Sequence, residues 1–101
     1  MKFTYKWNEE KNSLLKRTRN ISFEEIVVYL EAGKIVKILE HHNKDEYANQ
    51  KIYLININNY IYQVPYVIDY ENKWYFLKTI IPDRKLTKKY LITSEVQYDN
   101  R

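Results

Sequence analysis

The clearest alternation of apolar and polar positions lies just after residue 20 and predicts an amphipathic helix over Phe23–Ala32. Ser22 and Glu25 have the S-x-x-E spacing of a capping box, in which both side chains satisfy backbone N–H groups at the start of a helix. Gly33, the only glycine of the chain, stands where helices commonly end in a left-handed residue. Four apolar residues follow the i, i+3, i+4, i+7 spacing of one buried helix face. They are Phe23, Ile26, Val27 and Leu30.

The N-terminal segment predicts a short strand over residues 3–7, followed by a first helix over Glu9–Thr18. Aromatic and polar residues alternate in the strand, as in a half-buried β-strand. Asn8 can cap the helix, whose acidic residues come first and whose basic residues come last, as the helix dipole favours. Leu14 and Leu15 supply most of the apolar surface of this helix, so we expect much of it to be exposed.

The second half of the chain predicts four further strands. Residues 41–50 are polar and predict a loop. Asn58 and Asn59 separate two apolar runs, and asparagine tolerates the positive φ that a tight hairpin needs. Pro65 cannot donate a ladder hydrogen bond, so it indicates an edge or a bulge. The predicted strands are Ile35–Glu40, Lys51–Ile57, Tyr60–Ile68 and Trp74–Ile81.

The end of the chain predicts a short helix over Arg84–Leu91, with Asp83 as its cap. The order of elements then gives one α+β domain: an antiparallel sheet of about four to five strands, two helices near the N-terminus and a short C-terminal helix. We expect this domain to span residues 1–93 and residues 94–101 to form a loose polar tail.

Composition narrows the possible functions. A chain of 101 residues allows one domain with one core. The absence of cysteine excludes disulfides, thiolate zinc sites and cysteine nucleophiles. A single glycine excludes the glycine-rich phosphate loops of nucleotide-binding proteins. No long apolar run and no signal peptide are apparent, so we expect a cytoplasmic protein without a membrane span.

Charge is distributed unevenly along the chain. Residues 1–20 and residues 73–101 each carry a net charge of +4, whereas residues 21–72 carry −4. If the two basic ends meet in space, they form a surface suited to a phosphate backbone. The alternative is an ordinary mixed surface facing solvent.

Two basic features are candidates for binding phosphate. Strand alternation places Lys78 on the same side as Trp74, Phe76 and Ile80, where its ammonium could point into a groove or lie at the margin of the sheet. The densest basic stretch begins at Arg84, near a predicted helix N-terminus that favours anions. It contains Arg84, Lys85, Lys88 and Lys89, and its alternative interpretation is an exposed basic helix.

His41 and His42 are the only histidines, and histidine is the residue type that most readily exchanges a proton near neutral pH. His41 is therefore a candidate for proton transfer, the alternative being a pair of exposed loop residues. Adjacent residues of an extended chain point in opposite directions, so we expect the two histidines to form no joint metal site.

Three segments together resemble the BrnT family of bacterial type II toxins. The first is Y-K-W-N-E-E-K-N at Tyr5–Asn12, similar to the strand and helix that open that family. The second is T-R-N-I-S-F-E-E at Thr18–Glu25, where the family has K-H-G before an S-F-E-E stretch. The third is I-P-D-R-K-L-T at Ile81–Thr87, similar to the family's R-x-A-T basic helix. The resemblance covers about residues 3–91.

The resemblance implies a RelE-like domain that cleaves mRNA, inhibits translation and needs neither metal nor cofactor. It also implies a cognate antitoxin with a ribbon-helix-helix region, through which alone the complex would bind operator DNA. Cations would stabilise charge developing on the phosphoryl oxygens. The expected catalytic residues are Arg84, Arg19, Lys78 and His41, and the expected RNA-binding residues are Arg17, Lys85 and Lys88.

A non-catalytic module is the main alternative to the enzyme. A basic nucleic-acid-binding domain, or an accessory domain that binds another protein, would have the same charge distribution and element order. Only turnover of RNA separates these classes from a ribonuclease, because all nucleic-acid binders of this kind depend on salt.

Overall fold

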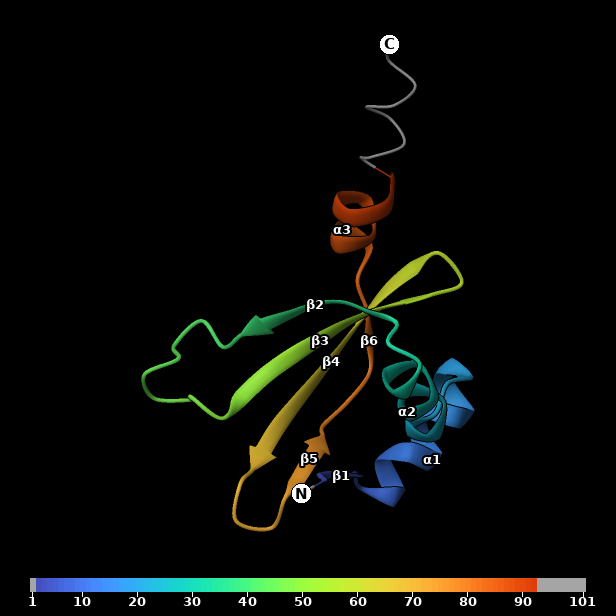
Figure 1. Ribbon diagram of the computed structural model, residues 1–101. Helices are drawn as coiled ribbons and strands as arrows, with labels where there is room; N and C mark the ends of the chain where they lie inside the picture. Colours follow the sequence, from blue (N-terminus) through green and yellow to red (C-terminus); the bar gives the residue numbers. More distant parts are fainter. Residues whose placement is uncertain (1, 93–101) are drawn as a thin grey trace.

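The computed structural model describes residues 2–92, which form one mixed β-sheet with helices on both of its faces (Figure 1). Strands β2, β3, β4 and β5 pair in an antiparallel manner, and β6 continues along β4 beyond the end of β5. The predicted α+β class is therefore confirmed. In chain order the elements are β1 (Thr4–Lys6), α1 (Glu9–Arg19), α2 (Phe23–Glu31), β2 (Ile35–Glu40), β3 (Gln50–Ile57), β4 (Tyr60–Asp69), β5 (Trp74–Leu77), β6 (Ile81–Pro82), α3 (Arg84–Thr87) and the π-helical turn η1 (Lys88–Ile92).

Strand β1 departs from the expected antiparallel arrangement. It lies at the edge of the sheet and runs parallel to β5, with Thr4 opposite Trp74. Aromatic contacts hold the pair together: the Phe3 and Tyr75 rings stack with their centroids 4.7 Å apart. The sequence contains the aromatic residues but no local signal for the direction in which they pair.

Helix α2 has the ends that the sequence predicts. The Ser22 hydroxyl accepts a hydrogen bond from the Glu25 N–H group at 3.1 Å. Gly33 has a φ of 74° and lies just past the helix, where the Lys34 N–H group donates to the Tyr29 carbonyl at 3.0 Å. This is the Schellman arrangement, in which a left-handed residue closes the last turn.

A buried asparagine joins α1 to α2. Asn12 is fully buried, and its side-chain oxygen accepts from the Phe23 N–H group at 2.8 Å. Its amide nitrogen donates to the Glu24 carboxylate at 2.9 Å. Asn12 thus satisfies a backbone donor at the start of α2, a group that the helix itself leaves without a partner.

The main core lies between the sheet and the pair α1 and α2. Figure 1 shows these two helices together on one side of the strands. The strand residues of this core alternate along β3 and β4, as expected for one face of a sheet. The core consists of Leu15, Ile21, Phe23, Ile26, Leu30, Tyr53, Ile55, Ile57, Val64, Tyr66, Ile68, Leu77 and Ile80.

Two asparagines account for the hairpin between β3 and β4, and one proline accounts for the bulge after β5. Asn58 and Asn59 have φ values of 54° and 66°, so the predicted tight turn is confirmed. Pro65 accepts from the Lys78 N–H group at 2.8 Å but has no N–H group to return the bond. The ladder is interrupted at this point, so of the two alternatives predicted for Pro65, an edge or a bulge, the structure has the bulge.

The predicted strand Trp74–Ile81 is consequently too long and its alternation is wrong at the end. Tyr66 pairs with Leu77 and Gln63 with Ile81, so four steps on one strand match three on the other. One extra residue turns Ile80 into the core beside Leu77, whereas it was expected to share a face with Lys78.

The C-terminal helix covers part of the opposite face of the sheet. Asp83 caps α3 as predicted, accepting from the Leu86 N–H group at 2.8 Å. The buried Thr87 hydroxyl accepts from the Ile61 N–H group at 2.8 Å and donates to the Asp83 carbonyl at 2.7 Å. The predicted single helix Arg84–Leu91 is instead an α-helical turn followed by a π-helical one. The predicted tail, residues 94–101, lies outside the described residues.

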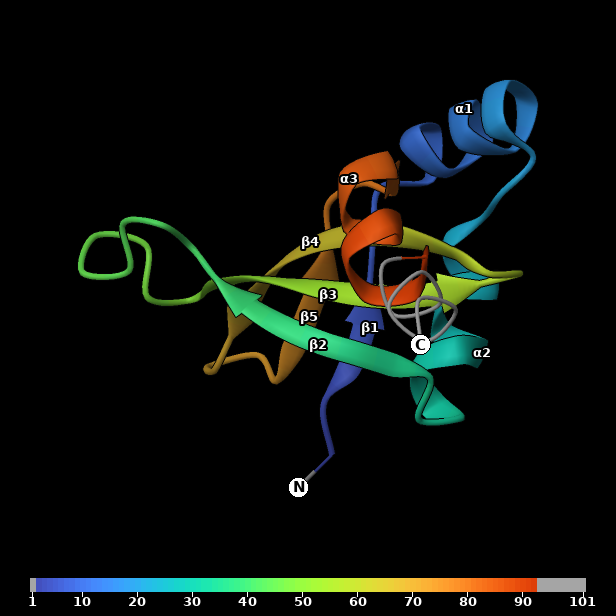
Figure 2. The same cartoon turned by 90° about the horizontal axis from the view of Figure 1, so that it is seen from above.

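Among residues 2–92, no helix has both the length and the apolar character needed to cross a membrane. The loop between β2 and β3 projects away from α1 and α2 in both views (Figures 1 and 2). The face of the sheet opposite α1 and α2 is therefore bounded by α3 at one end and by this loop at the other.

Candidate nucleic-acid interface

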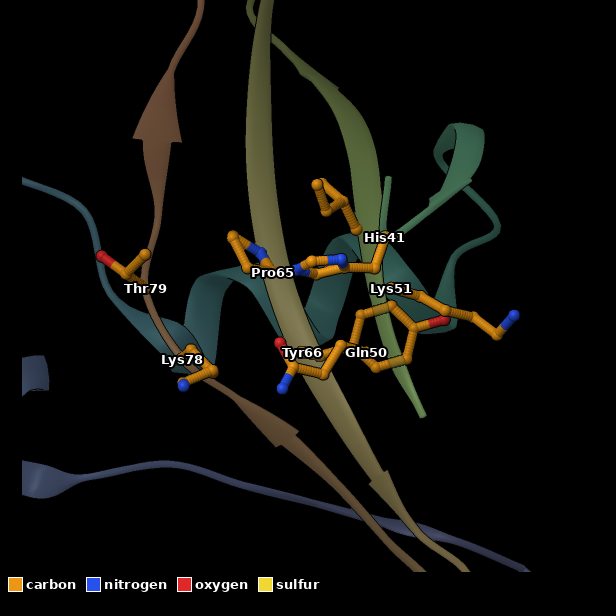
Figure 3. Close-up of a pocket in the computed structure, with 8 residues that line it drawn as sticks. His41, Gln50, Lys51, Pro65, Tyr66, Lys78 and Thr79 are labelled. Atoms are coloured by element: carbon orange, nitrogen blue, oxygen red, sulfur yellow. The ribbon is translucent and has the colours of Figure 1, made fainter. Parts of the chain in front are cut away.

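A pocket of about 340 Å³ opens on the sheet face opposite α1 and α2 (Figure 3). Its floor is formed by Ile52 and Pro65, which are direct partners across β3 and β4. Gln50, His41, Lys78 and Thr79 surround this apolar floor with polar atoms. The pocket thus combines an apolar surface with hydrogen-bonding and cationic side chains, a combination typical of ligand sites.

Lys78 reaches the pocket because of the break after β5. Its backbone is tied to Pro65, and its exposed side chain lies on the pocket side of the sheet. Figure 3 places Lys78 and Thr79 together on one side of the cavity, with Lys51 on the other side and pointing outward. The Lys51 ammonium lies 3.7 Å from the Glu40 carboxylate. Among residues 2–92, Lys78, the other lysine of the pocket, has no such ion pair.

His41 enters the same pocket from the end of β2. The backbone N–H group of His41 donates to the Gln50 carbonyl at 3.3 Å. Its ring atom Nδ1 accepts from the backbone N–H group of Asn43 at 3.0 Å. In the neutral ring the proton is therefore on Nε2, which remains as a donor. In this conformation the ring can donate a hydrogen bond through Nε2.

The two histidines do not point in opposite directions, contrary to expectation. The chain turns directly after β2, and the His41 ring stacks on the His42 ring with centroids 4.4 Å apart. Its other neighbour is the Tyr47 ring, also at 4.4 Å. These contacts fix the orientation of His41 beside the pocket.

The two basic ends of the chain meet at Arg19. Its guanidinium donates to the Ile80 carbonyl at 2.8 Å, which joins the end of α1 to the segment between β5 and β6. Arg19 and Arg17 are both exposed on α1 and lie outside the lining of the pocket. The Arg19 contact places the α1 cations beside the segment that carries Lys78, as a shared basic surface requires.

The basic residues of the C-terminal segment are exposed but do not line the pocket. Arg84, Lys85 and Lys88 follow β6 and lie on α3 and at the start of η1. The carboxylate of Asp83 already accepts from the first turn of this short helix, so the expected anion position at its N-terminus is filled from within the chain. Of the four expected catalytic residues, the pocket brings together His41 and Lys78 and leaves Arg19 and Arg84 outside.

Two pocket residues, Gln50 and Thr79, were not singled out from the sequence, and neither was Asn43, which donates a hydrogen bond to His41. Gln50 was assigned to the loop, but it is the first residue of β3 and its side chain lies two positions before Ile52 on the same face. The alternation of β3 continues through Gln50 into the preceding loop. This continuation is the sequence signal that could have identified Gln50 as a pocket residue. The roles of Thr79 and Asn43 depend on the bulge and on the loop conformation.

Tyrosines pack on the covered side of the sheet behind the pocket, and one of them, Tyr66, also contributes to the pocket lining. Tyr53 and Tyr66 are buried, with ring centroids 4.0 Å apart and nearly parallel planes. Burial raises the pKa of both hydroxyls, and neighbouring tyrosines raise the pKa of Tyr53 further. Burial likewise raises the pKa of Tyr5. These hydroxyls stay protonated at neutral pH and belong to the core.

Comparisons with known proteins assign no family to the chain: no family model, curated protein or solved structure matches it. The resemblance to BrnT toxins remains a prediction carried by its three segments. Two residues of those segments, Asn12 and Thr87, are buried and hydrogen-bonded in the fold. Within residues 2–92, no three histidine, aspartate or glutamate side chains gather as a metal site would need.

Proposed function

We propose that the protein is the toxin of a type II toxin-antitoxin system and cleaves RNA without a metal ion. The observation that carries this proposal is the pocket on the open sheet face, where His41 and Lys78 line one cavity. The meeting of the two basic ends at Arg19 and Ile80 supports it, because a basic surface beside the pocket attracts a phosphate backbone.

The reaction proposed is attack of a ribose 2′-hydroxyl on its own 3′-phosphodiester. The 2′-oxygen gives its proton to solvent water and bonds to phosphorus, and the bond to the 5′-oxygen breaks. The leaving 5′-oxygen takes up a proton from water, which yields a 2′,3′-cyclic phosphate. Lys78 stabilises the charge that develops on the phosphoryl oxygens, and the Nε2–H group of His41 donates to the same oxygens. This assignment makes His41 an electrostatic partner in the conformation held by Asn43.

The remaining cations hold the RNA on either side of the pocket. Arg84, Lys85 and Lys88 contact phosphates over α3, and Arg17 contacts phosphates over α1. Arg19 contacts phosphate through those guanidinium N–H groups that do not donate to the Ile80 carbonyl. Such contacts add affinity with little dependence on sequence.

The biological setting proposed is the cytoplasm, with a cognate antitoxin that covers the basic surface. Expression of the protein alone is expected to slow bacterial growth, and co-expression of the neighbouring reading frame is expected to restore it. Normal growth despite abundant folded protein would count against the toxin assignment.

The direct test is single-turnover cleavage of a short RNA in excess EDTA. Lys78→Ala is expected to lower the rate roughly a hundredfold, the effect of one lost oxyanion donor, with an unchanged melting temperature because the side chain is exposed. Lys34→Ala removes the same charge from an exposed position outside the pocket and serves as the control. Equal rates for the two variants would remove Lys78 from the mechanism, and loss of all cleavage in EDTA would overturn the metal-independent route.

A non-catalytic RNA-binding protein is the second candidate, and the position of Arg19 and Arg84 favours it. Both guanidiniums lie outside the pocket lining, and one of them is bonded to a backbone carbonyl. RNA that binds with salt dependence but is recovered intact after long incubation would support this candidate over the ribonuclease.

A further inference from the structure

We propose that the pocket on the open sheet face binds a single adenine nucleotide of single-stranded RNA, and that Gln50 selects the base. The inference rests on the proposed RNA-binding function and adds the identity of the base that the pocket accepts. Four features carry it: the pocket floor, the position of the Gln50 amide, the hydrogen-bonding edges of the bases, and the cation across the pocket.

The floor suits the flat face of a base. Ile52 and Pro65 are paired directly across β3 and β4 and are both half-buried, so their side chains form one apolar patch. The cavity above them, about 340 Å³, lies within the range of small-molecule sites. A single-stranded base can leave its neighbours and stack on such a patch, which is how proteins commonly read RNA.

The Gln50 amide stands at the rim of this floor. Its backbone is fixed on both sides, because its N–H group donates to the Tyr47 carbonyl at 3.0 Å and its carbonyl accepts from His41. The side chain points to the pocket side of β3, and Figure 3 shows its amide between the β3 strand and Lys78. An amide presents one acceptor and two donor hydrogens side by side.

Adenine fits this pattern better than the other bases. Its Watson–Crick edge and its Hoogsteen edge both present one donor, N6–H, beside one acceptor, N1 or N7. Guanine offers a donor beside an acceptor on its Watson–Crick edge, N1–H beside O6, but presents two acceptors on its Hoogsteen edge, and the pyrimidines likewise have only one suitable edge. A glutamine amide therefore pairs with adenine in two orientations, in keeping with the bidentate glutamine–adenine pairs of DNA readout.

Lys78 completes the nucleotide site. It lies across the cavity from the β3 rim, and its exposed ammonium is free to contact the phosphate attached to a base on the floor. A phosphate contact positions the nucleotide without reading it, and the amide contact reads it. In this pocket Lys78 therefore contributes affinity for the nucleotide, and Gln50 contributes selectivity for its base.

The test is the binding of four fluorescent RNA heptamers, each of uridines with a central A, G, C or U. The central nucleotide is 2′-deoxy so that it cannot be cleaved. The protein is expected to bind the A-centred heptamer at least about fivefold more tightly than the others, the lower end of a bidentate contact. Gln50→Glu is expected to move the preference to guanine, whose N1–H and N2–H groups offer two donors to a carboxylate.

Controls separate the base contact from charge and folding. Asn58→Asp adds the same charge at the exposed β3–β4 turn and is expected to keep the adenine preference. Gln50→Ala is expected to bind all four heptamers alike, with a melting temperature close to that of the unchanged protein. RNA binding without an adenine preference, or a preference that Gln50→Glu leaves unchanged, would overturn this inference alone. Failure to bind any heptamer would overturn the proposed function itself.

Discussion

The two faces of the sheet use the same strands for different purposes. On the face covered by α1 and α2, Tyr53, Ile55 and Tyr66 are buried in the main core. On the other face, the neighbouring residues Ile52 and Pro65 are only half-buried and form the floor of a pocket. On that second face Leu54 and Ile61 are fully buried, so only the part of it around the pocket is open to a ligand.

Because of this difference in burial, neighbouring residues of one strand can contribute separately to stability and to binding. Substitutions on the covered face should unfold the protein, whereas substitutions of the half-buried residues that form the pocket floor should alter binding in a folded protein. The predictions that follow test this separation, beginning with the largest expected effect.

The sharpest comparison is between Ile55 and Ile52, which lie on opposite faces of β3. Ile55→Ala removes a fully buried side chain and is expected to lower the free energy of unfolding by about 2–5 kcal/mol. Ile52→Ala is expected to cost well under half of that and to weaken RNA binding. Urea denaturation and heptamer binding measure the two effects. Equal destabilisation by both variants would show that the open face is part of the core.

Asn12→Ala tests whether the covered face depends on one buried polar contact. The change leaves the Phe23 N–H group without its partner and is expected to cost about 1–3 kcal/mol. Ser13→Ala, at the exposed neighbouring position of α1, is the control and should change stability little. A negligible effect of Asn12→Ala in urea denaturation would mean that water or a shifted side chain replaces the bond.

The tyrosines make the covered face sensitive to alkaline pH. Burial raises the pKa of Tyr53 and Tyr66 above the ordinary value of 10.0, so the folded state holds their protons longer than the unfolded state does. Their contribution to stability is complete below pH 10.0 and decreases as the pH rises beyond it. Tyr53→Phe removes a hydroxyl whose pKa is raised by burial and is expected to change the free energy of unfolding by less than about 1 kcal/mol at neutral pH.

The same variant gives a direct check of this pH dependence. Tyr53→Phe should make the alkaline loss of stability shallower, because one late-titrating hydroxyl is gone. Absorbance of tyrosinate and circular dichroism, followed together from pH 9 upward, measure titration and unfolding. Complete titration of all tyrosines in a protein that remains folded would contradict the prediction.

The smallest expected effect is at Glu24, on the exposed side of α2. A hydrogen bond from Asn12 is the main cause that lowers the pKa of this carboxyl below its ordinary value of 4.5, and Lys16 at 3.7 Å adds to it. A lowered folded pKa means that Glu24 stabilises the protein above pH 4.5 and loses this effect as the pH falls through the folded value. Glu24→Gln should flatten the acid side of the stability profile, with a change of only a few tenths of a kcal/mol at pH 7.

Local signals account for the parts of the fold that the sequence predicted. Ser22, Gly33, Asn58 and Asn59 determine backbone geometry within a few residues, so their helix ends and turns could be placed without any tertiary information. The parallel pairing of β1 depends on residues some seventy positions away, for which no pattern exists within either segment. The bulge after β5 was indicated by Pro65, but its effect on Ile80 appears only when the two strands are paired.

The candidate site divides in a similar way. Lys78 was found by strand alternation and His41 by its residue type, and both line the pocket. The exposed residues Arg19 and Arg84 were singled out by charge and resemblance, which carry no information on distance from a cavity. Gln50 was missed because it was counted with the polar loop, although the alternation of β3 continues through it.

The parallel pairing of β1 with β5 also determines the order in which the chain can fold during synthesis. Thr4 leaves the ribosome well before its partner Trp74, which is made only after five other elements. Helices α1 and α2 can form earlier because their contacts are local, whereas the closure of the sheet edge must wait for a long-range contact. Until then Phe3 lacks the Tyr75 ring against which it stacks in the native fold. Completion of the aromatic edge is therefore one of the last events in the assembly of this domain.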